Sequence, residues 1–89
     1  MSSDLDFGQL RQEGGKLFGE GRYDEALAFY DRALEIRPNE VEILEQKADA
    51  LLALGKSEAA LECHNRIIAI DPNNPSAQLK KGDLLATLD

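Results

Sequence analysis

Apolar and small residues recur along the chain with the spacing of amphipathic helices. Two runs keep positions three or four residues apart: Leu10, Gly14, Leu17 and Phe18, then Ala26, Leu27, Tyr30, Ala33 and Leu34. The strict alternation of a half-buried strand is absent from both runs. The pattern predicts an all-α chain with helices near residues 5–20, 24–37, 40–54, 57–70 and 75–88.

Glycine and proline mark where the predicted helices end. Gly21 and Gly55 follow two of the apolar runs, where a helix often closes with a left-handed residue that glycine adopts at little cost. Pro38 and Pro72 follow the predicted helices 24–37 and 57–70 and cannot continue a helix. These residues place the connections between the predicted helices at about 21–23, 38–39, 55–56 and 71–74.

Capping residues mark the predicted starts. Asn39 followed by Glu42 resembles a capping box, and Ser57 stands where it could cap the fourth helix. Asn74 before Pro75 places a cap ahead of a proline at the first helical position.

The marker residues repeat after 34 positions. Gly21, Ala26 and Pro38 recur as Gly55, Ala60 and Pro72, and the same offset links Gly14, Ala48 and Gly82, and Leu17, Leu51 and Leu85. The chain therefore contains about two and a half copies of one helical hairpin.

This unit resembles the tetratricopeptide repeat. The first copy matches seven of the family's eight signature positions: Leu10, Gly14, Leu17, Ala26, Tyr30, Ala33 and Pro38. The second copy matches at Leu44, Ala48, Leu51, Ala60 and Pro72. The resemblance implies a right-handed superhelical stack in a single domain, residues 1–89. Its predicted units are repeat 1 (7–40), repeat 2 (41–74) and a partial repeat or capping helix (75–89).

A few positions depart from the family pattern. Glu13, Lys47 and Lys81 stand where an apolar residue is usual, so we expect either a Glu13–Lys47 ion pair or aliphatic stems packed below solvated charges. His64 replaces an aromatic residue and is expected to be a packed core imidazole. Cys63 is expected to act as a small, partly buried hydrophobe.

The charge balance bears on the kind of partner. Seventeen acidic residues against ten basic ones give a net charge of −7, which repels phosphate backbones and anionic lipids. We therefore expect no nucleic-acid or membrane partner, but a protein or peptide that is basic or carries apolar anchors. The first residues resemble no targeting signal and Cys63 is the single cysteine, so we expect a cytoplasmic location.

The resemblance also implies a concave groove lined by the first helix of each hairpin, which binds a segment of another protein. The positions that we assign to this groove are Arg11, Phe18, Glu45, Gln46, Asp49, Leu52, Leu79, Lys80 and Asp83. Some family members hold a terminal carboxylate with five residues, and here those places read Arg11, Gly15, Gln46, Ser76 and Lys80. Two cations and one amide remain, so we expect this clamp to be degenerate.

Two hypotheses concern apolar side chains. Phe18, Leu52 and Leu79 are predicted to form an apolar floor in the groove, or alternatively to complete the packing between adjacent helices. A leucine face near the end of the sequence predicts a homodimer or a self-associating scaffold unit, which is the alternative to a peptide-binding adaptor; it consists of Leu84, Leu85 and Leu88.

The sequence offers little for catalysis. His64 and Cys63 are neighbours on a helix and diverge by about 100°, so they cannot form a nucleophile–base pair. One histidine and one divergent cysteine are too few for a zinc site, and no glycine motif of a phosphate-binding loop is present. We expect no enzyme activity, no metal and no cofactor.

Overall fold

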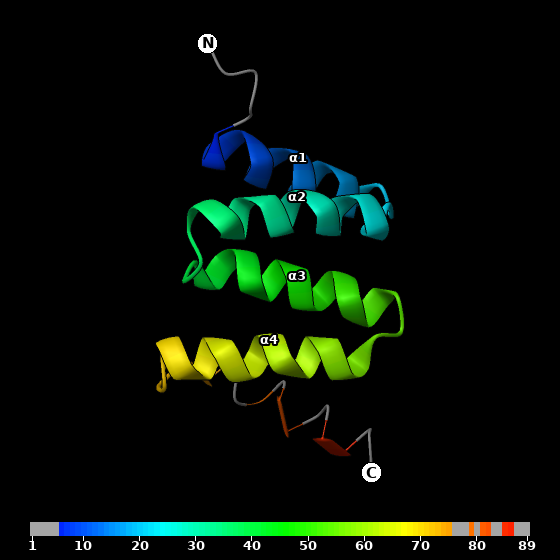
Figure 1. Ribbon diagram of the computed structural model, residues 1–89. Helices are drawn as coiled ribbons and strands as arrows, with labels where there is room; N and C mark the ends of the chain where they lie inside the picture. The colour runs from blue at the N-terminus through cyan, green and yellow to red at the C-terminus, as the bar shows by residue number, and fades with distance from the viewer. Residues whose placement is uncertain (1–5, 76–78, 80, 83–84, 87–89) are drawn as a thin grey trace.

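Within the described part of the chain, four helices stack one after another, each antiparallel to the next (Figure 1). The computed structural model describes residues 6–75, 79, 81–82 and 85–86, and no strand occurs among them. The helices are α1 (Phe7–Gly19), α2 (Tyr23–Ile36), α3 (Val41–Ala53) and α4 (Ser57–Ile70). Each packs along the helix that follows it, and α1 also contacts α3. The predicted all-α hairpin array is thereby confirmed.

The fifth predicted helix, 75–88, is described only in part. Its described residues, 75, 79, 81–82 and 85–86, have helical backbone. Residues 76–78, 80, 83–84 and 87–89 lie outside the described part of the chain. The first two predicted repeats each contain one helix pair, α1 with α2 and α3 with α4.

The turns after α1 and α3 have the same geometry. Gly21 and Gly55 both have φ of +78°, the left-handed conformation that the sequence predicted. The next residue closes each turn: Arg22 N–H donates to the Leu17 carbonyl at 2.9 Å, and Lys56 N–H to the Leu51 carbonyl at 2.8 Å. These 6→1 bonds satisfy carbonyls that the helix end would otherwise leave unpaired.

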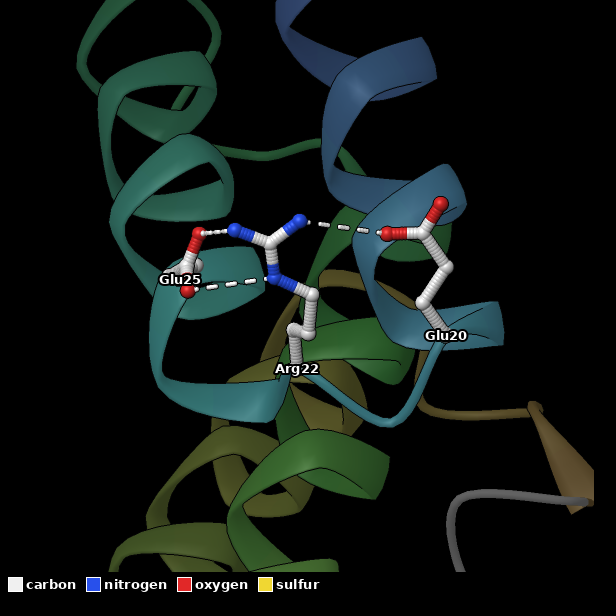
Figure 2. Close-up of polar contacts among 3 residues, drawn as sticks. All are labelled: Glu20, Arg22 and Glu25. Carbon is white, nitrogen blue, oxygen red and sulfur yellow. Dashed lines mark hydrogen bonds and ion pairs between the residues drawn. The ribbon is translucent and has the colours of Figure 1, made fainter.

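A set of surface ion pairs reinforces the first of these turns (Figure 2). The Arg22 guanidinium reaches Glu20 across the turn at 3.4 Å, and it donates from Nε and Nη2 to the carboxylate of Glu25. Hydrogen bonding to Glu25 is the main cause that raises the pKa of Arg22 above its usual value. The three residues tie the end of α1 to the start of α2.

The predicted starts of α3 and α4 agree with the structure to within one residue, but the capping residues predicted for them are wrong. Glu40 occupies the N-cap position of α3 without a capping hydrogen bond from its side chain, so Asn39 lies in the preceding turn and no Asn39–Glu42 capping box forms. Lys56 is the N-cap of α4, which makes Ser57 its first helical residue rather than its cap. Both helices begin without a side-chain cap. Packing against the preceding helix fixes the direction of each one, so a local cap is not needed.

A capping box that the sequence analysis did not predict begins α1. The Asp6 carboxylate accepts from Gln9 N–H at 2.8 Å, and the Gln9 side-chain oxygen accepts from Asp6 N–H at 3.0 Å. The two bonds satisfy donors at the exposed start of the stack.

The core runs between the helices in three clusters of buried side chains. The first joins α1, α2 and α3, and consists of Leu10, Leu17, Ala26, Tyr30, Ala33 and Ile43. The second lies between α3 and α4, and consists of Ala48, Leu51, Ala60 and Cys63. Leu44 and Ile67 form the third, and His64 is fully buried as expected. Signature positions of both repeats therefore supply most of the core.

The small residue at position 14 is required by Tyr30. A Cβ atom added to Gly14 would lie 2.5 Å from Cε1 and 2.8 Å from Cδ1 of the Tyr30 ring. The ring of Tyr30 occupies the space that the missing side chain leaves.

Candidate functional site

A polar hollow of about 430 Å³ lies between α1 and α3. It is lined by Gly8, Arg11, Gln12, Gly15, Glu42 and Gln46. Both helices are the first of their hairpins, and these are the helices expected to line the predicted groove. It brings together two of the predicted groove residues, Arg11 and Gln46.

An ion pair spans this hollow. Nη1 of Arg11 on α1 lies 2.7 Å from Oε1 of Glu42 on α3, although 31 residues separate them in sequence. Both side chains are about half exposed, at 48% for Arg11 and 56% for Glu42. The pair is therefore accessible to a ligand and partly screened by water.

Gln46 is the other notable polar group here. It lies one turn after Glu42 on the same face of α3, and its side-chain oxygen is buried without a hydrogen-bond partner among the described residues. A buried acceptor without a donor costs free energy, so a ligand that donates a hydrogen bond to this oxygen would remove that cost.

The remaining predicted groove residues are spread over the stack. Glu45 and Asp49 are half-buried on α3. Leu79 is 68% exposed, whereas Lys80 and Asp83 lie outside the described residues. The assignment of these positions to a groove stays a prediction.

Two residues of the predicted apolar floor, Phe18 and Leu52, pack against different core clusters. Phe18 packs against the first core cluster and meets the Tyr23 ring edge-on, with 5.2 Å between ring centroids. Leu52 packs against the second core cluster. Both contacts favour the alternative interpretation, in which Phe18 and Leu52 complete the packing between adjacent helices.

The residues assigned to self-association are described only in part. Leu85 is 46% exposed, and Leu84 and Leu88 lie outside the described residues. Association through this face stays a prediction.

A larger hollow, of about 730 Å³, opens on the other side of α3, and the sequence analysis did not predict it. Its floor includes Leu44, Lys47 and Leu51 of α3, and its walls come from α2 and α4. At about 100° per residue, these three positions point away from Glu42 and Gln46. The signal in the sequence was Lys47, a charged residue at a position that is apolar in the repeat pattern.

Lys47 forms an ion pair that the sequence did not predict. Its Nζ lies 2.8 Å from Oδ1 of Asp31 on α2, so the partner is Asp31 rather than Glu13. Lys47 is 29% exposed and lines the larger hollow together with Leu44 and Leu51.

Burial shifts the pKa of two core groups. Desolvation raises the pKa of the Cys63 thiol, and although Lys47 opposes this effect, the net direction is upward. Desolvation also raises the pKa of Tyr30, and the charge of Asp49 adds to it. Both groups are therefore protonated at neutral pH, and neither is an activated nucleophile.

Neither a metal-ligand cluster nor a membrane-spanning helix occurs among the described residues. No group of three or more His, Cys, Asp or Glu side chains in this part of the chain is placed to hold a metal ion. Every helix in the same part is too short or too polar to cross a membrane.

The repeated hairpins and their identical turns define an all-α helical repeat protein. The sequence profile of the tetratricopeptide repeat family matches residues 17–86, and the chain therefore belongs to this family. It is 39% identical over 46 residues to human tetratricopeptide repeat protein 33 and 37% identical to the Xenopus laevis protein over a segment of the same length. Each match covers 52% of this chain but only 18% of the relative.

Solved structures show the same fold. The first TPR of Spaghetti (RPAP3), bound to the HSP90 peptide SRMEEVD, superposes with a TM-score of 0.86 and 25% identity, covering 94% of this chain and 67% of that one. The second TPR of Spaghetti, bound to the same peptide, gives a TM-score of 0.84 and 23% identity over 94% of this chain and 78% of that one.

Proposed function

We propose that this chain is a non-catalytic protein-interaction module that binds a peptide or helix of a partner protein along the face formed by α1 and α3. The observation that carries the proposal is the polar hollow between these helices, where Arg11 and Glu42 meet across two repeats. The two solved relatives, each bound to an HSP90 peptide, support a peptide as the ligand class.

The charges on this face favour a basic ligand. Glu42, Glu45 and Asp49 follow one another along α3, whereas Arg11 is the cation that α1 contributes to the hollow. An acidic peptide would face like charges here, and a peptide with Lys or Arg would be attracted. The exposed side chain of Leu79 offers an apolar contact further along the chain.

The module would act as an adaptor or scaffold, since it holds a partner without changing it chemically. A cytoplasmic site of action is part of this proposal, and it rests on the single cysteine of the chain. Fractionation of cells that express the tagged protein would test the location.

The experiment that tests peptide binding combines a selection with a matched pair of variants. Heptapeptides are selected from a random library on the 89-residue chain, and the tightest binder is titrated by ¹⁵N NMR. We expect the largest shifts at the amides of Gly8, Gly15 and Gln46, which line the hollow.

Gly15→Leu and Gly19→Leu form the matched pair. Both glycines are exposed on α1, where an added Cβ would meet open space, but only Gly15 lines the hollow. Gly15→Leu should weaken binding at least about tenfold by filling the site, whereas Gly19→Leu should bind as the wild type does. Shifts confined to α2 and α4, or equal binding by both variants, would place the ligand elsewhere and refute the proposal.

A further inference from the structure

The hollow between α1 and α3 is lined by one positively charged and one negatively charged side chain. Among its six lining residues, all within the described part of the chain, Arg11 is the one cation and Glu42 the one anion. They are bonded to each other at 2.7 Å, so the guanidinium that could receive a ligand carboxylate is already engaged by a carboxylate of the protein.

We infer that Glu42 is the specificity-determining residue of this site: it closes Arg11 to acidic ligands and offers its own carboxylate to a Lys or Arg side chain. The inference rests on the proposed peptide-binding function and adds the charge of the ligand. A ligand carboxylate would have to displace Glu42 from Arg11 and then remain close to the displaced charge. A ligand cation would likewise have to displace Arg11, which is about half exposed as Glu42 is, but it would also be attracted by the acids that follow along α3.

The position of Glu42 in α3 supports this role. It is the second residue of the helix, in the first turn, where unpaired backbone N–H groups favour a negative side chain. The backbone beneath it is held by the bond from Leu44 N–H to the Glu40 carbonyl at 3.1 Å. The carboxylate therefore starts from a fixed backbone at the rim of the hollow.

The other acidic residues on this face of α3 also favour a basic ligand. Glu45 and Asp49 extend the negative charge along α3 beyond the hollow, so an acidic peptide that had displaced Glu42 would meet two further acids. A basic peptide would gain from the same charges, and the gain would be largest at low salt.

Two probe peptides of opposite charge test the inference. The acidic probe is SRMEEVD, the peptide bound by the solved relatives, and the basic probe is SRMKKVK with an amidated carboxyl end. Each carries a fluorophore and is titrated with the wild type, Glu42→Gln and Glu58→Gln in about 20 mM salt, where screening is weak. The measured quantity is the ratio of the dissociation constant of the acidic probe to that of the basic probe.

Glu58→Gln is the matched control. Glu58 is the exposed second residue of α4, as Glu42 is the second residue of α3, so both variants lose one negative charge from a first helical turn. Only Glu42 lines the hollow. The wild type should prefer the basic probe, and Glu42→Gln should lower the ratio about fivefold or more, while Glu58→Gln leaves it within about twofold.

Three results would overturn the inference. A wild type that prefers the acidic probe, equal ratios for the two variants, or no binding of either probe by any variant would each show that Glu42 does not select ligand charge. The proposed peptide-binding function is judged separately, because a binder selected from the library that shifts Gly8 and Gly15 would support it even when both charged probes fail.

Discussion

At the scale of the residue, each repeat matches a small side chain on its first helix to a ring on its second. Gly14 leaves room for Tyr30, which is fully buried against it. The corresponding positions 34 residues later hold Ala48 and His64, both fully buried. From the first repeat to the second, the residue at the small position becomes larger and the ring becomes smaller, so the summed volume of the two side chains changes little.

Gly14→Ala should destabilise the protein although alanine is the better helix former. The added Cβ would lie 2.5 Å from the Tyr30 ring, and this overpacking costs about 1–3 kcal/mol. Gly15→Ala is the control, since a Cβ there meets open space, and it should raise the free energy of unfolding by up to about 1 kcal/mol. Urea denaturation followed by circular dichroism measures both. Equal stabilisation by the two variants would mean that Tyr30 moves aside without cost.

At the scale of the element, the helices differ in how they begin. Helix α1 has a reciprocal capping box, whereas α2, α3 and α4 have no side-chain cap. The three uncapped helices each pack against a helix that precedes them, and α1 has no such neighbour in the described part of the chain. Tertiary contacts thus replace local hydrogen bonds wherever a preceding helix is present. Arg37 also lies over the Phe7 ring at 4.4 Å and covers the first residue of α1.

Asp6→Ala should therefore loosen the start of α1. Loss of the side-chain bond to Gln9 N–H costs about 1 kcal/mol, and amide hydrogen exchange should accelerate in the first turn of α1 but not in α3 or α4. Asp24→Ala is the control, because Asp24 is an exposed acid in the first turn of α2 that caps no helix. If the two variants exchange alike, the lost charge rather than the cap is responsible.

At the scale of the complete stack, exposed apolar side chains are few in the described part of the chain. The large ones are Ile36, Leu79 and Leu85. Leu85 belongs to the leucine face for which the sequence predicts self-association, so the oligomeric state is the property to measure.

Sedimentation from low to high micromolar concentration should show reversible association if the leucine face binds a second copy. Leu85→Glu should then restore the monomer, whereas Ile36→Glu, which removes a similarly exposed side chain on α2, should not. A wild type that stays monomeric throughout would remove self-association and leave the peptide-binding adaptor.

The sequence predicted a structural feature well where it depends on the spacing of residues along the chain. It predicted poorly where the feature depends on how one helix packs on another. The left-handed Gly21 and Gly55 and the buried His64 were foreseen, because glycine conformations and the 34-residue period are local properties. The Asn39–Glu42 cap was wrong, since packing of α3 on α2 decides where the helix starts. Likewise, the sequence offered Glu13 as a partner for Lys47, and only the stack brings Lys47 to Asp31.

There is a physical reason why some features follow from the sequence and others only from the tertiary structure. Helical periodicity, turn glycines and the repeat period are properties of neighbouring residues, so the amino-acid order alone specified the helices, the hairpins, the family and most of the core. Interactions between side chains on different hairpins depend on how the hairpins are stacked. It took the packed helices to establish that Arg11 faces Glu42 across a hollow, and that a second hollow opens behind α3.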